Sequence, residues 1–167
     1  DGSLVVEQKV PTQETASSFV KKALGDLEQK KFSSAIENLT RAIDLDPSTT
    51  VAYSLRGTAY LSQDEPTQDE VISGVNDLHT YLCKRTEKGE DLVYNLLIGV
   101  LFTHQQFNLA IEMLSEFIEI DPDFNRLYYM RGQAYKAMSN WSRAIADFTH
   151  YVEKFESPGG YKLRGEV

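Results

Sequence analysis

Residues 32–47 read FSSAIENLTRAIDLDP, and residues 107–122 read FNLAIEMLSEFIEIDP. The two segments share half of their positions, and the identities continue beyond them at the same offset of 75 residues. Tyr53, Arg56, Gly57, Ala59 and Tyr60 return, without a gap, as Tyr128, Arg131, Gly132, Ala134 and Tyr135. Identities of apolar, small and charged residues at one fixed offset indicate a duplicated structural unit.

This unit divides again into shorter repeats. An aromatic residue recurs at intervals of 34, 41, 34 and 33 residues, at Phe19, Tyr53, Tyr94, Tyr128 and Tyr161. A small residue recurs at another position of the repeat, at Ala35, Gly74, Ala110 and Ala144. Small residues at fixed phases are typical of helices that cross closely, because a large side chain at the crossing would hold the backbones apart.

The spacing of apolar residues predicts that these repeats are helical. Within 32–43 and again within 107–118, apolar side chains recur at alternating intervals of three and four, which places them on one side of a helix. Pro47 and Pro122 follow these stripes and predict helix ends, because proline disfavours helical geometry in the residue before it.

An acidic insertion lengthens the second repeat at residues 62–70. We expect Pro66 to end one helix here, since proline cannot donate to the helical hydrogen-bond ladder. Thr67 and Glu70 have the spacing of a capping box, which predicts the start of the next helix. The insertion should therefore form an exposed, acidic corner.

The combined pattern resembles the tetratricopeptide repeat, a helix-turn-helix unit of about 34 residues. The family's aromatic, glycine, tyrosine, alanine and second aromatic positions are matched by Tyr128, Gly132, Tyr135, Ala144 and Phe148. The resemblance implies an all-α fold, a right-handed superhelical solenoid of about four helix-turn-helix repeats. The four repeats are expected at residues 16–49, 50–88, 91–124 and 125–157.

Two departures from the family pattern and the two chain ends lead to further expectations. Asp26 replaces the usual tyrosine and Ile98 the usual glycine, which puts in doubt only the local packing that the family pattern predicts. Residues 1–15 carry no helical stripe, so we expect a flexible N-terminal lead. Residues 158–167 match the beginning of the repeat pattern, so we interpret them as the start of a possible fifth repeat or as a tail.

Composition argues against several classes of function. The chain has 17 basic and 25 acidic residues and a net charge of −8, whereas nucleic-acid binding needs a concentrated basic face. No apolar run approaches the roughly 18 residues of a membrane span, so we expect none. The single cysteine, Cys83, excludes an internal disulfide and is compatible with a reducing compartment, so we expect the cytoplasm rather than secretion.

The sequence contains no arrangement typical of catalysis. His79 and Cys83 have a spacing that can place two ligands on one metal ion, but a zinc site needs three or four, and no third is evident. The other histidines, His104 and His150, stand alone, and neither a phosphate loop nor a nucleophile motif is present. We therefore predict no metal site, no cofactor and no enzymatic activity.

The resemblance also implies where a partner would bind, because in tetratricopeptide arrays the first helix of each repeat lines a concave groove. The residues at the matching positions, which we assign to the groove, are Val20, Leu24, Leu27, Val51, Ser54, Thr58, Leu61, Asn95, Phe102, Arg126, Tyr129, Gln133 and Lys136. Leu92 occupies a further position of this set. Such a groove suits an amphipathic helix or an extended segment, with its acidic or C-terminal end near Arg126 and Lys136. The alternative for each apolar member is packing against a neighbouring helix.

These features predict a non-catalytic protein-protein interaction scaffold that binds a peptide or helix of a partner protein. The alternative is a substrate-holding chaperone or a co-chaperone adaptor, and a structural spacer is the third possibility. The carboxylate clamp of chaperone adaptors is not matched, since only Arg126 has the residue type that the clamp requires. The oligomeric state is left open.

One repeated arginine is expected to serve the fold instead of the groove. Arg56, Arg131 and Arg164 share the repeat position directly before the glycine of the helix crossing. Their aliphatic stems should pack there, and their guanidinium groups should reach carbonyls or acids at its edge.

Overall fold

The computed structural model describes residues 14–86 and 91–155 of the chain. These residues form helices and turns and contain no strand. The helices are α1 (Ala16–Glu28), α2 (Phe32–Leu45), α3 (Thr50–Leu61), α4 (Gln68–Lys84), α5 (Asp91–Thr103), α6 (Phe107–Ile120), α7 (Arg126–Ala137) and α8 (Trp141–Phe155). The prediction of an all-α fold is confirmed.

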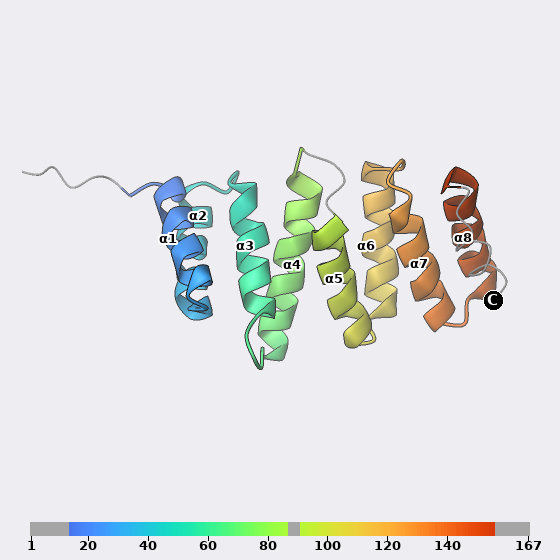
Figure 1. The fold of residues 1–167 in the computed structure, drawn as a ribbon, viewed down its shortest axis with the longest axis horizontal. Coiled ribbons are helices and arrows are strands. Elements are labelled where there is room, and N and C mark those ends of the chain that lie inside the picture. The colour runs from blue at the N-terminus through green and yellow to red at the C-terminus, as the bar shows by residue number, and fades with distance from the viewer. Residues whose placement is uncertain (1–13, 87–90, 156–167) are drawn as a thin grey trace, which may run out of the picture.

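The helices follow one another in a row along the longest axis of the molecule (Figure 1). Packing is most extensive between α1 and α2, between α3 and α4, and between α7 and α8. Each range expected from the sequence contains two successive helices, which in the range 91–124 are the less closely packed α5 and α6. We propose that these four pairs are the four repeats. They are called here the first, second, third and fourth pair.

Three of the pairs share one type of turn between their helices. In each turn a non-glycine residue adopts a left-handed conformation. The backbone N–H of the next residue, three positions beyond the helix end, donates to the carbonyl five residues before it. This is the Schellman arrangement, which satisfies carbonyls that the helix end leaves free. The left-handed residues are Lys30, Gln105 and Ser139, and the closing bonds are Lys31 N to Asp26 O, Gln106 N to Leu101 O and Asn140 N to Tyr135 O.

The second pair has a longer connection, as the acidic insertion predicts. Helix α3 ends at Leu61, before it reaches Pro66, so the expectation that the proline ends this helix is wrong. The apolar stripe of α3 stops at Leu61, and the polar residues after it have no core to pack against. Thr67 caps α4, and the capping box with Glu70 is present as predicted.

This cap supports a modest prediction. Replacing Thr67 with alanine should lower the free energy of unfolding by about 1 kcal/mol, because the Thr67 side chain accepts a hydrogen bond from the first turn of α4. Urea unfolding followed by circular dichroism would measure the change. Thr49→Ala is the matched control, since Thr49 occupies the N-cap position of α3 without a capping bond. Equal losses in the two variants would contradict the assignment.

Small residues allow the helices of the second and fourth pairs to approach closely. A Cβ atom added at Gly57 would lie 2.9 Å from the carbonyl oxygen of Gly74. One added at Gly132 would lie 2.6 Å from the ring of Phe148. The prediction that small residues mark close helix crossings is therefore confirmed for these two pairs.

The third pair differs because Ile98 stands where the family pattern has glycine. Ile98 is buried, and α5 approaches α6 less closely than the helices of the other pairs approach one another. A cavity of about 640 Å³ lies beside this pair, lined by side chains such as Val75, Leu101 and Leu109. The large side chain thus holds the two helices apart, and the packing that the family pattern predicts is not found in this pair.

The other departure, Asp26, is compensated by polar contacts. Its carboxylate accepts hydrogen bonds from the Ser34 hydroxyl at 2.7 Å and from the Asn38 amide at 2.9 Å, both on α2. These bonds replace the apolar contacts of the usual tyrosine. The packing of the first pair is therefore kept by a different kind of interaction.

The core of the described residues forms two clusters along the row of helices. The smaller cluster joins α1 and α2 to the start of α3 and is rich in alanine. The larger one extends from α4 to α7 and contains the buried aromatic residues Tyr94 and Phe117. No helix within residues 14–86 and 91–155 has the length and apolar character needed to cross a membrane.

Several expectations fall outside the described residues. Residues 1–13 of the N-terminal lead, the stretch 158–167 and Arg164 belong to this group. Of the lead, Thr15 is described, and it caps α1 through a capping box with Ser18.

Candidate partner-binding face

The thirteen residues assigned to the groove all lie on the first helices of the four pairs, α1, α3, α5 and α7. On each helix they are three, four or seven positions apart, which places them on one side of that helix. None of the thirteen is buried; each is exposed or half-buried. This set of thirteen residues is called the first-helix face below.

Exposed apolar side chains mark the part of this face that α1 and α3 contribute. Leu24 on α1 is 44% exposed, and Val51 on α3 is 47% exposed. Leu92, at the further groove position on α5, is 83% exposed. Exposed large apolar residues also occur elsewhere, for example at Leu45 on α2 and Ile145 on α8. Exposure alone therefore does not define the binding face.

Other apolar members of the face partly support the fold. Val20 and Leu27 pack against the smaller core cluster. Leu61, Phe102 and Tyr129 pack against the larger one. Each of these five side chains therefore packs partly against neighbouring helices, which is the alternative to partner binding at the apolar groove positions.

The polar members come together where α5 meets α7. The Arg126 guanidinium donates a hydrogen bond from Nη2 to the Asn95 side-chain oxygen, over 3.2 Å. Gln133 donates from its amide to the Tyr129 hydroxyl, over 2.8 Å. Lys136 lies one turn further along α7 and is half-buried. Two neighbouring first helices thus contribute hydrogen-bonding groups to one region of the face.

Arg56 does not belong to this face but joins three helices. From α3 it forms a two-pronged ion pair with the Asp77 carboxylate on α4, with Nε and Nη2 at 2.7 and 2.8 Å. Its third nitrogen donates to the Thr40 hydroxyl on α2, over 3.0 Å. The side chain of Asp77 is buried, so this pair is shielded from solvent.

Arg131 repeats this arrangement in the fourth pair. It binds the buried Asp147 on α8 at 2.9 and 2.8 Å and donates to the Ser115 hydroxyl on α6 at 3.1 Å. The expectation that these arginines reach acids at the helix crossing is confirmed. The identity of the acids was missed, although both aspartates stand three residues after the small residue of their helix, Gly74 or Ala144.

Sequence reasoning also missed a neighbour of His79 and Cys83. No third metal-ligating residue was evident in the sequence, but Glu116 from α6 lies within hydrogen-bond distance of His79 and next to Cys83. Burial and the negative charge of Glu116 raise the pKa of Cys83 to about 11. The hydrogen bond from His79 lowers the pKa of Glu116. A protonated thiol beside a carboxylate is poorly suited to nucleophilic chemistry.

Comparison with solved structures relates this arrangement to known proteins. The chain is similar to the crystal structure of MamA, with 25% identity, coverage of 84% of this chain and 78% of MamA, and a TM-score of 0.62. It is similar to YrrB, described as a TPR protein with an unusual peptide-binding site, with 18% identity, coverage of 92% and 76%, and a TM-score of 0.63.

A third similar structure is the C-terminal part of a TPR repeat-containing protein from Cytophaga hutchinsonii. Its identity is 15%, the match covers 85% of this chain and 54% of that one, and the TM-score is 0.64. No protein-family model matches the sequence, and no curated protein matches it. The structural likenesses confirm the resemblance to the tetratricopeptide repeat at the level of the fold.

Proposed function

We propose that this array of tetratricopeptide-type helix pairs is a non-catalytic interaction scaffold that binds a peptide or a helix of a partner protein along the first-helix face. Helical solenoids of this kind present extended concave surfaces that serve for binding. The observation that carries the proposal is that the thirteen residues follow one side of the first helices of successive pairs and that none is buried, although the set includes seven large apolar side chains.

The chemistry of the face suggests which segment would bind. Leu24 and Val51 offer apolar surface on the first two pairs, while Asn95, Arg126 and Lys136 offer hydrogen-bond donors and positive charge on the last two. An amphipathic helix or an extended segment with apolar anchors would match the first part. An acidic or C-terminal end would match the second, because carboxylates pair well with arginine.

The proposal predicts the effect of placing charge on the apolar part of the face. Peptides would first be selected from a random displayed library against the wild-type protein, and their affinity measured by fluorescence anisotropy. The double variant Leu24→Glu/Val51→Glu should weaken binding at least tenfold, because buried carboxylates would meet the apolar anchors. Leu45→Glu/Ile145→Glu is the matched control, with comparable exposure on second helices, and should bind as the wild type does.

Peptide binding and a chaperone assay together separate the proposed face from the other possible functions. Selected peptides that lose affinity only in the control variant would contradict the proposed face. A substrate-holding chaperone would suppress the light scattering of a heat-denatured client protein, whereas a scaffold would not. A structural spacer would yield no peptides with micromolar affinity.

A further inference from the structure

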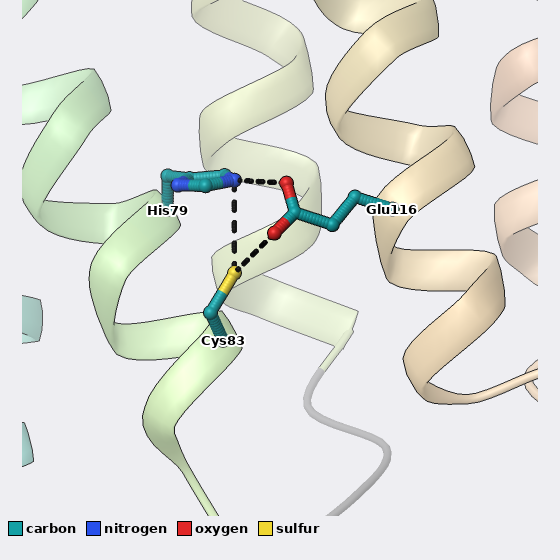
Figure 2. A group of neighbouring side chains, drawn as sticks. All are labelled: His79, Cys83 and Glu116. Carbon is teal, nitrogen blue, oxygen red and sulfur yellow. Dashed lines mark hydrogen bonds and ion pairs between the residues drawn. The ribbon is translucent and has the colours of Figure 1, made fainter.

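Three side chains capable of binding a metal ion meet where the second and third pairs join. His79 and Cys83 lie one turn apart on α4, and Glu116 reaches them from α6 (Figure 2). His79 Nε2 lies 2.8 Å from Glu116 Oε2, Cys83 Sγ lies 3.5 Å from Glu116 Oε1, and Cys83 Sγ lies 3.6 Å from His79 Nε2. One ligand atom from each residue can be chosen within 4.8 Å of the others.

These distances are close to those of a tetrahedral zinc site. Zinc bonds of about 2.0 Å to nitrogen, 2.1 Å to oxygen and 2.3 Å to sulfur place neighbouring ligand atoms about 3.4–3.6 Å apart. The two distances that involve Cys83, to His79 Nε2 and to Glu116 Oε1, already have this length. The 2.8 Å contact of His79 is with the other oxygen, Oε2, so the Glu116 carboxylate would have to turn for a single oxygen to complete the set. Glu116 is exposed, so a water molecule could take the fourth position.

The two helices hold the three side chains in place without a metal ion. Phe117, next to Glu116, is fully buried in the larger core cluster and fixes this part of α6. Its ring also packs against the ring of His79, with the centroids 5.5 Å apart. Sites on packed helices are positioned more exactly than sites on loops, which lowers the cost of ordering ligands on binding.

The types of ligand favour a particular class of ion. The Cys83 thiol would release its proton to solvent on binding, because cysteine binds metal ions as a thiolate. A thiolate, an imidazole and a carboxylate together suit zinc and related transition metals, whereas magnesium and calcium prefer sites made of oxygen atoms. Three protein ligands with one open position are a known zinc arrangement. Because the ligands come from both α4 and α6, a bound ion would also link these two helices.

We propose that His79, Cys83 and Glu116 bind one divalent transition-metal ion, zinc foremost, and that this ion clips the second pair to the third. The site is separate from the first-helix face, because none of the thirteen residues belongs to α4 or α6. The clip would act beside the third pair, whose helices are spaced more widely than those of the other pairs. Metal binding would therefore stiffen the row of helices at this joint.

Cobalt provides a direct test, because a thiolate bound to Co²⁺ gives a charge-transfer absorption band in the near ultraviolet. Titrating Co²⁺ into the reduced full chain should give a saturable band at one ion per chain, with the protein's mass in solution unchanged. Cys83→Ser should abolish the band, and His79→Asn and Glu116→Gln should each weaken binding at least about tenfold. His104→Asn, which removes an exposed histidine outside the cluster, should leave binding unchanged.

Zinc should also displace the cobalt and raise the melting temperature of the wild type by about 5–10 °C at a hundredfold excess over its Kd. Glu116→Gln preserves the size of the side chain, so it should remain folded and lose most of this increase. The proposal would be overturned by the absence of a saturable band in the wild type. Binding that His79→Asn and Glu116→Gln leave unchanged, or one ion shared by two chains, would overturn it equally.

Discussion

Replacing Asp147 with alanine is expected to lower the free energy of unfolding by about 3–5 kcal/mol. Only 8% of the Asp147 side chain is exposed, and both of its oxygens accept bonds from Arg131. In the variant, the positively charged guanidinium group of Arg131 would stay within the helix crossing. It would still donate to the uncharged Ser115 hydroxyl, but no carboxylate would balance its charge. The large effect comes from this uncompensated buried charge rather than from the lost attraction alone.

The third pair suggests how to separate these two causes. At the positions equivalent to Arg131 and Asp147 it carries Leu97 and Met113, which are both buried in the larger core cluster. The double variant Arg131→Leu/Asp147→Met should therefore recover most of the lost stability, since an apolar pair of similar volume often replaces a buried ion pair at little cost. Urea unfolding of the wild type, of Asp147→Ala and of the double variant would give the three free energies of unfolding.

Two further measurements make this prediction specific. Glu37→Ala removes the acid of an exposed pair with Arg41 and should change stability little, because exposed ion pairs contribute little. The double variant should also bind selected peptides as the wild type does, since Arg131 lies outside the first-helix face. A double variant as unstable as Asp147→Ala would refute the explanation by buried charge.

The fold could be predicted from the sequence because each local signal agrees with the others. The stripe in residues 107–118, the small residues Gly57 and Gly132, and the cap at Thr67 all depend on interactions between residues near in sequence or on one repeated helix crossing. Such signals survive in a single sequence. The wide spacing between α5 and α6 could not be predicted from the sequence, because the effect of Ile98 depends on how far two whole helices move apart.

Two side-chain clusters, the one around Arg56 and the one around Cys83, could be recognised only in the three-dimensional structure. Asp77 lies 21 positions after Arg56, and Glu116 lies 33 positions after Cys83, so neither partner shares a helix turn with the residue it contacts. Equivalent positions on α4 and α6 are 36 residues apart, as Gly74 and Ala110 show, so a shift by one repeat leads from neither His79 nor Cys83 to Glu116. The first-helix face remains a prediction, because it depends on a partner and not on internal contacts.

Replacing Gly132 with alanine is expected to lower the free energy of unfolding by about 1–3 kcal/mol, although alanine favours helices. The new methyl group would lie 2.6 Å from the Phe148 ring, which is buried and cannot move aside without displacing α8. Gly99→Ala is the matched control within helix α5, where an added Cβ meets no atom within 4 Å.

The control should gain about 0.5–1 kcal/mol, because glycine loses more backbone entropy on folding than alanine does. The two substitutions are chemically identical and both lie within first helices, so the difference in sign isolates the helix crossing as the cause. Thermal and urea unfolding of both variants would measure it. A gain in stability for Gly132→Ala would mean that α7 and α8 can separate freely, and that the small residue at this repeat position does not set their distance.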